Sequence, residues 1–364
     1  MQLSENELVT LLLCSDLAVG DVSPLSDSAY SAFATALYKE NRQPSDLFSM
    51  SSENIAEIYQ KYRQQLFSRC RTCDFDTRIP YLLKRHQQLT IELSDLNDRG
   101  ISVVTRANRD LYPQKLRKKF CKSKIPLPPV IFYCGNLGLI ETNKSISVVG
   151  SRDLKKDKTA ELFTRNFVFS AIDDGFSVSS GGAKGIDQIA FESSLSKGGH
   201  SIIAVSDSMI KRICEPMVRK AIMAGDSLWL SIVNPKEKFK SYNAMARNKI
   251  IYAVSDYAMV VTCEYHTSVK NGKEVINNNK GGTWVGAHEC ADKELSRLMV
   301  RSSPNAPKGN NELLNTLDCI NIEESKILLG SSVSDLIDKN VSVGYQYRKY
   351  EEGNIFSFVL GLKP

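Results

Sequence analysis

The stretch Ser179–Asp187, SSGGAKGID, places three glycines and one lysine between an expected strand and an expected helix. The apolar run Phe176–Val178 comes before it, and the residues from Ile186 to Leu195 have helical spacing. A glycine-rich turn from strand to helix can bind an anion with its backbone N–H groups and the positive end of the helix dipole. The spacing matches neither G-x-G-x-x-G nor the P-loop, which argues against dinucleotide and P-loop NTPase chemistry.

The segments on both sides of this stretch continue the alternation of strand and helix. This pattern predicts an α/β fold with a doubly wound, mostly parallel Rossmann-like sheet. The other expected strands are Ile146–Val149, Ser201–Val205, Leu228–Val233, Ala258–Cys263 and a short one at Met299–Val300. The expected helices are Thr159–Ile172, Met217–Met223, Arg247–Val254, Gly286–Leu298 and Leu313–Asp318, and a long polar loop is expected over Thr267–Lys280.

The sequence before residue 96 has a different character. Residues 1–95 form several short helical patterns, the first of which opens with a capping-box spacing at Ser4–Glu7. We therefore predict three parts: a small helical domain over 1–95, the Rossmann-like domain over 96–325, and a short C-terminal extension over 326–364.

The overall composition is that of an ordinary globular protein, with 42% hydrophobic and 24% charged residues. No apolar run is long enough to span a membrane and the first residues lack the pattern of a signal peptide, so a cytoplasmic location without a membrane partner is expected. The nine cysteines are scattered and odd in number, which favours reduced thiols. Cys70 and Cys73 form the single C-x-x-C pair, and no metal site or cofactor is expected.

The net charge of +6 is concentrated in two segments. Arg99–Lys124 holds nine basic residues against Asp110 alone, and Lys236–Lys249 holds five against Glu237. A charge run is most often a solvated face, but two of them in one basic chain favour a phosphate-rich partner.

Polar and glycine residues follow the expected strands of the sheet. In doubly wound sheets, ligands bind outside the carboxyl ends of the strands. Three such loops carry the pattern: Gly150, Ser151 and Arg152; Gly181, Gly182, Lys184 and Gly185; and Gly281, Gly282 and Thr283. One glycine pair alone would indicate only a tight turn, whereas three loops on one sheet edge favour an anion site.

With these motifs in order, the chain resembles the DNA-processing protein A family (DprA/Smf), a branch of the Rossmann-like group that also holds the LOG-type nucleotide hydrolases. The resemblance rests on six segments in register over Tyr112–Val261: Tyr112-Pro113 with Leu116, Pro128-Pro129 with Phe132 and Gly135, Val148–Arg152, Ser180–Asp187, Gly199 with Ser201–Val205, and Arg247–Ile251 followed by Ser255-Asp256 and Met259–Val261.

The resemblance implies a non-catalytic protein that binds and protects single-stranded DNA. It further implies transfer of that DNA to a RecA-type recombinase, a homodimer, and a SAM-like fold for the N-terminal helices. The DNA contacts that it implies are Gly150, Ser151, Arg152, Gly181, Gly182, Lys184, Gly185, Arg247, Asn248 and Lys249.

The sequence also departs from the family. Phe191 replaces the family's histidine, and residues 326–364 are too few for the winged helix of some members. These departures argue against assigning the chain to natural transformation specifically, and they leave a housekeeping, mobile-element or phage-defence role as alternatives. The pathway and the recombinase partner stay open.

Two alternative functions use the same glycine loops. The first is a nucleotide sensor with Gly281, Gly282, Thr283 and Glu289 as a ligand lid. The second is a LOG-like hydrolase of nucleoside monophosphates. In that family the catalytic glutamate follows the threonine by three residues, whereas Glu289 follows Thr283 by six.

Overall fold

The computed structural model describes residues 3–18, 20–67, 74–155, 157–264, 267–270, 273–276 and 281–340; for 267–270 and 273–276 it describes the backbone alone. The chain divides into two compact units. The first comprises Met1–Asn143 and Ile202–Val254, and the second comprises Lys144–Ser201 and Ser255–Pro364. Each unit is therefore built from two separate stretches of sequence. The predicted domain boundaries after residues 95 and 325 fall within helices α5 (His86–Asp98) and α14 (Glu324–Leu328).

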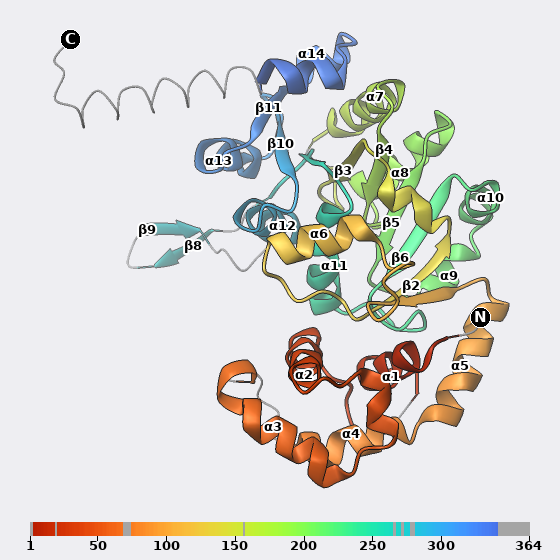
Figure 1. Ribbon diagram of the computed structural model, residues 1–364. Coiled ribbons are helices and arrows are strands. Elements are labelled where there is room, and N and C mark those ends of the chain that lie inside the picture. The colour runs from red at the N-terminus through yellow and green to blue at the C-terminus, as the bar shows by residue number, and fades with distance from the viewer. Residues whose placement is uncertain are drawn as a thin grey trace, which may run out of the picture. The chain divides into compact units, whose positions relative to one another are not determined.

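The first unit begins with helices, as predicted (Figure 1). Ser4 and Glu7 form the expected capping box at the start of α1. The rings of Phe33, Tyr59 and Phe67 surround Phe75, with centroids 4.9–5.5 Å from its own. These aromatic side chains form part of the core of the helical region. The helices are α1 (Glu5–Cys14), α2 (Asp27–Lys39), η1 (Pro44–Phe48), α3 (Ser52–Leu66), α4 (Phe75–Leu83) and α5.

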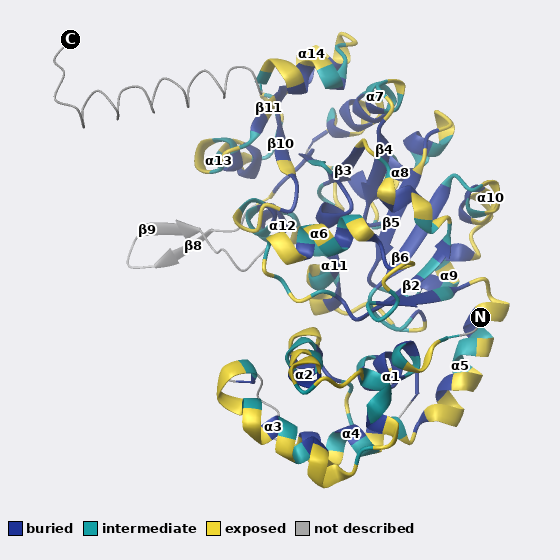
Figure 2. Ribbon diagram, in the orientation of Figure 1, coloured by how far each residue is buried: buried dark blue, intermediate teal, exposed yellow. Residues whose placement is uncertain are grey.

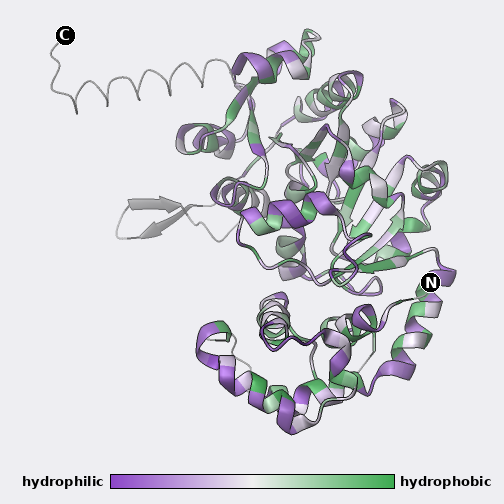
Figure 3. Cartoon of the chain, viewed as in Figure 1, coloured by the Kyte–Doolittle hydropathy of each residue, from purple (hydrophilic) through white to green (hydrophobic). Residues whose placement is uncertain are grey.

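The rest of the first unit is a sheet with helices. Its strands lie in the order β1 (Ser102–Thr105), β2 (Val130–Gly135), β6 (Ser227–Ser231), β5 (Ser201–Val205). Strands β1 and β2 are antiparallel, as are β2 and β6, so this part of the sheet departs from the parallel pattern. The connecting elements are α6 (Gln114–Lys122), η2 (Leu137–Glu141), α9 (Met209–Ile213), α10 (Pro216–Ala224) and α11 (Ser241–Ala253). Figure 3 shows α6 largely in purple, the hydrophilic end of its scale.

The second unit has the predicted Rossmann-like topology. Its strands lie in the order β4 (Ser177–Ser180), β3 (Ser145–Val149), β7 (Tyr257–Val260), β10 (Arg297–Ser302), β11 (Ile320–Glu323), and every neighbouring pair is parallel. All residues of β3 and β4 are buried (Figure 2), as expected for strands covered on both faces. The helices are α7 (Ala160–Asp173), α8 (Ile186–Ser196), α12 (Gly282–Asp292), α13 (Lys308–Thr316), α14 and a last helix over 333–340.

Several expectations for the second unit were wrong. The segment Thr267–Lys280 is not simply a loop, because β8 (Thr267–Lys270) and β9 (Lys273–Ile276) pair as an antiparallel hairpin. The missed signal was Asn271-Gly272, the dipeptide that most favours a two-residue hairpin turn.

The end of the second unit also differs from expectation. The helix expected over Gly286–Leu298 begins at Gly282 and stops at Asp292, because Glu294 adopts a positive φ of 49°. Helix α13 is not the last element, since β11, α14 and residues 333–340 follow it. Val333, Leu336 and Ile337 pack into the same core as β3 and α7, so these residues of the predicted extension belong to the core of the second unit.

Over the described residues, no helix is long and apolar enough to cross a membrane.

Candidate phosphate-binding site

The loops that follow β3 and β4 touch at Gly185. This residue has a positive φ of 83°, and a Cβ atom on it would lie 2.3 Å from the carbonyl oxygen of Ser151 and 2.8 Å from Cα of Arg152. The next residue, Ile186, donates its N–H to the Ser151 carbonyl oxygen at 3.2 Å. A side chain at position 185 would force the two loops apart, so glycine is required there for both its conformation and its size.

A second glycine joins these loops to β7. A Cβ atom on Gly150 would lie 2.5 Å from Cγ1 of Ile186 and 2.7 Å from Oγ1 of Thr262. The same Thr262 hydroxyl, just beyond β7, accepts the N–H of Ser151 at 2.7 Å. The ends of β3 and β7 and the start of α8 therefore form one connected group.

The surface of this group presents cationic side chains and backbone donors. Arg152 and Lys184 are exposed, and Gly182 has a positive φ of 62°. In the part of the chain that the structure describes, the N–H groups of 182–184 donate to no acceptor. They lie directly before the first turn of α8, whose own first N–H groups carry the positive end of the helix dipole. This combination of donors suits the oxygens of a phosphate group.

The third predicted loop lies at the start of α12. Gly281 has a positive φ of 105°, and its Cβ position is 2.9 Å from the carbonyl oxygen of Glu264, whereas Gly282 has open space around it. Thr283 and Glu289 both belong to α12 and are half-buried. Six helical residues separate them by about 9 Å along the axis. Three of the four residues predicted to form a ligand lid, Gly282, Thr283 and Glu289, therefore belong to a helix, and their role as a lid stays a prediction.

The remaining predicted contacts lie on α11 in the first unit. Arg247 is 5% exposed, and its Nη1 donates to the carbonyl oxygen of Ala204 at 3.1 Å. Its side chain is therefore buried in that unit, and its predicted contact with DNA stays a prediction. Asn248 and Lys249 are half-buried. Tyr242, near the start of the same helix, is 63% exposed with Nζ of Lys240 5.9 Å from its ring centroid.

Two buried polar residues that sequence reasoning missed stabilise the second unit. Arg301 is fully buried and donates to Asp157 Oδ2 at 2.7 Å and to Glu324 Oε2 at 2.8 Å. Asn310 accepts the N–H of Cys263 at 2.7 Å and donates to the carbonyl oxygens of Val261 and Arg301. These contacts fix the ends of β7 and β10. A lone Arg or Asn in an apolar segment is a weak sequence signal, since most such residues are exposed.

The cysteines do not form a metal site among the described residues. Burial raises the pKa of the Cys263 thiol to about 12, and the charge of Glu264 acts in the same direction. A thiol with such a pKa is neutral at physiological pH and is a weak nucleophile. The C-x-x-C pair of Cys70 and Cys73 lies outside the described residues.

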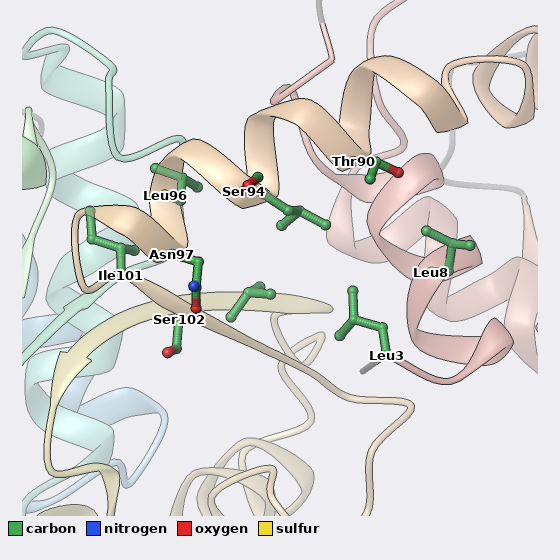
Figure 4. A pocket seen from close by; sticks show the side chains of 10 residues that line it. Leu3, Leu8, Thr90, Ser94, Leu96, Asn97, Ile101 and Ser102 are labelled. Atoms are coloured by element: carbon green, nitrogen blue, oxygen red, sulfur yellow. The ribbon is translucent and has the colours of Figure 1, made fainter. Parts of the chain in front are cut away.

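One cavity of about 340 Å³ lies in the first unit, between α1, α5 and β1 (Figure 4). Its lining residues are Leu3, Leu8, Thr90, Leu93, Ser94, Leu96, Asn97, Ile101, Ser102 and Val103. Because none of these side chains is charged, the cavity lacks the chemistry of a phosphate site.

Comparison with known proteins gives matches in sequence and in fold. The model of the family described as DNA recombination-mediator protein A matches residues 103–269. The DNA processing protein DprA of Streptococcus pneumoniae is 28% identical over 180 residues, which are 46% of this chain and 59% of that protein. Protein Smf of Synechocystis is 26% identical over 231 residues, or 58% of this chain and 55% of its own length. The chain thus spans little more than half the length of either relative.

The solved structure of DprA from Streptococcus pneumoniae has a similar fold. It aligns with a TM-score of 0.61 and 18% identity, covering 91% of this chain and 99% of that one.

Proposed function

We propose, from the premise that this chain belongs to the DNA recombination-mediator protein A family (DprA/Smf), that it binds single-stranded DNA through the loops around Gly185. The observation that carries the proposal is the contact of Gly185 with Ser151 and Arg152, which joins two glycine loops beside two exposed cations. That contact explains why a residue without a side chain is needed at position 185 of SSGGAKGID.

Each part of the site has a role in holding a phosphate group of the DNA backbone. Arg152 can donate two parallel N–H bonds to phosphate oxygens, and Lys184 supplies a flexible point charge. The N–H groups of 182–184 add neutral donors at the start of α8. None of these groups selects a base edge, so binding should depend steeply on salt and weakly on sequence. Exposed Tyr242 on the first unit is suited to stacking against a base.

We propose binding without catalysis. In the LOG-type family the catalytic glutamate follows the threonine by about one helical turn, whereas Glu289 stands about 9 Å along α12 from Thr283, so the catalytic pair of that family is not reproduced here. A free nucleotide could present the same phosphate oxygens to the loops, so it serves as a competitor in the test below. Three further points stay predictions from the resemblance. They are delivery of the DNA to a RecA-type recombinase, formation of a homodimer, and a role in a mobile element or phage defence.

The test is fluorescence anisotropy with a labelled single-stranded oligonucleotide at several salt concentrations. We expect the double variant Arg152→Ala, Lys184→Ala to bind the oligonucleotide at least about tenfold more weakly, because it loses two phosphate contacts. The control is Arg165→Ala with Lys197→Ala, which removes the same charges from surface ion pairs elsewhere in the second unit. Equal binding by both variants would contradict the proposal. Full competition by a mononucleotide at micromolar concentration would favour the sensor function instead.

A further inference from the structure

We propose that the basic face of α6, together with Lys124, is a second binding surface for the phosphate backbone of nucleic acid. The proposal rests on the proposed function in that it assumes a nucleic-acid partner. It concerns a different part of the chain, in the first unit, and none of the residues discussed above for DNA contact belongs to it.

The sequence of α6, QKLRKKFCK, divides cleanly between two faces. Leu116 and Phe120 are buried one turn apart and hold the helix on its unit. Lys118, Lys122 and Lys124 are exposed. The helix itself contains no carboxylate. The other exposed residues of α6, Gln114 and Cys121, carry no charge, and Glu141 meets the helix only at its first turn, where Oε1 accepts the N–H of Lys115 at 3.2 Å. The exposed charges on the helix itself are therefore all positive.

Part of the basic content of α6 has a structural explanation. Nζ of Lys115 donates to the carbonyl oxygen of Thr142 at 3.2 Å. Nη2 of Arg117 donates to the carbonyl oxygen of Arg106 at 3.3 Å, and its guanidinium carbon lies 5.3 Å from the ring centroid of Tyr112. Lys119 and Lys122 in the last turn also balance the negative end of the helix dipole. These roles do not account for Lys118, which stands a turn earlier, or for Lys124 beyond the helix.

The spacing of the exposed cations suits a nucleic-acid backbone. Lys118 and Lys122 are one helical turn apart, a rise of about 6 Å along the axis. Two nucleotides of a DNA strand advance by about 7 Å. Lysine binds phosphate as a point charge without a fixed geometry, and α6 itself exposes no aromatic side chain for stacking on bases. The surface should therefore bind single and double strands by their phosphates alone.

The test compares two variants of the full chain that lose the same charge. The first carries Lys118→Gln, Lys122→Gln and Lys124→Gln; glutamine has nearly the helix propensity of lysine, so the helix should persist. The control carries Lys211→Gln, Arg219→Gln and Lys220→Gln, three exposed cations on α9 and α10 of the same unit. Binding is measured against salt with labelled single-stranded and double-stranded oligonucleotides of about 30 nucleotides, long enough to exceed one binding site.

We expect the α6 variant to lower the slope of log affinity against log salt by about 2 for single strands and about 3 for double strands. The control should change neither slope by as much as 1. A change with only one oligonucleotide would assign the surface to that form of nucleic acid. Equal slopes of log affinity against log salt for the α6 variant and the control would overturn the proposal. An acidic protein would then be the remaining partner to test on this face.

The same measurement separates this proposal from the one above. If Arg152→Ala with Lys184→Ala retains full binding but the α6 variant loses it, the site at Gly185 fails and the α6 surface stands. If the reverse holds, the Gly185 site stands and α6 is only a solvated basic helix.

Discussion

At the scale of the residue, the site depends on the backbone contact at Gly185. We predict that Gly185→Ala destabilises the fold by about 1–3 kcal/mol for a backbone conformation (φ 83°, ψ −132°) that glycine alone adopts readily. Overlap with the backbone of Ser151 and Arg152 should cost about 1–3 kcal/mol more. Gly198→Ala is the matched control, because Gly198 has a φ of +75° and nothing within 4 Å of its Cβ position. Urea unfolding measures the loss of stability in each variant. Equal losses for Gly185→Ala and Gly198→Ala would mean that the two loops can separate at little cost in free energy.

The buried side chain of Arg301 leads to a second prediction at this scale. Replacing Arg301 with methionine leaves Asp157 and Glu324 buried without their cation, which should cost about 3–5 kcal/mol of unfolding free energy. Adding Asp157→Asn and Glu324→Gln removes the uncompensated charges. This triple variant should therefore be more stable than Arg301→Met alone. Urea unfolding of the two proteins compares them, and a less stable triple variant would refute the explanation.

At the scale of the element, a hydrogen bond from the N–H of Ser151 to Thr262 links the loop after β3 to the residues just beyond β7. Thr262→Val keeps the shape of the side chain but removes the hydroxyl that accepts the N–H of Ser151. We predict a loss of about 1–3 kcal/mol in stability and weaker binding of single-stranded DNA, because Arg152 follows the released residue. Thr262→Ser keeps the acceptor and should restore binding measured by anisotropy. If valine binds DNA as well as threonine does, the bond is not needed to position Arg152.

At the scale of the whole molecule, residues 333–340 complete the core of the second unit although they come last in the described chain. Ile337 is 3% exposed and packs against that core, so Ile337→Ala should cost about 2–5 kcal/mol. Leu329→Ala is the control, because Leu329 is 86% exposed and its loss should change stability by less than about 0.5 kcal/mol. Chemical unfolding compares the two variants, and equal stability would show that the helix does not support the core.

The sequence by itself determined the features that depend on local pattern. Alternating apolar runs and helical spacing identified the Rossmann-like topology, and the glycines of SSGGAKGID identified a turn that needs bare backbone. Both depend on neighbours within a few residues, so they are visible without coordinates. The ordered motifs from Tyr112 to Val261 added the resemblance to the DprA/Smf family, because six short patterns in register carry more information than any one of them.

Only the tertiary structure decided which polar residues face solvent and which face the core. Arg152 and Arg247 are equally basic and both follow the family pattern, yet the first is exposed and the second donates to Ala204 inside its unit. The network of Arg301, Asp157 and Glu324 joins residues up to 167 positions apart in the chain. Burial depends on what the rest of the chain packs against a residue, and such long-range contacts leave little trace in local spacing.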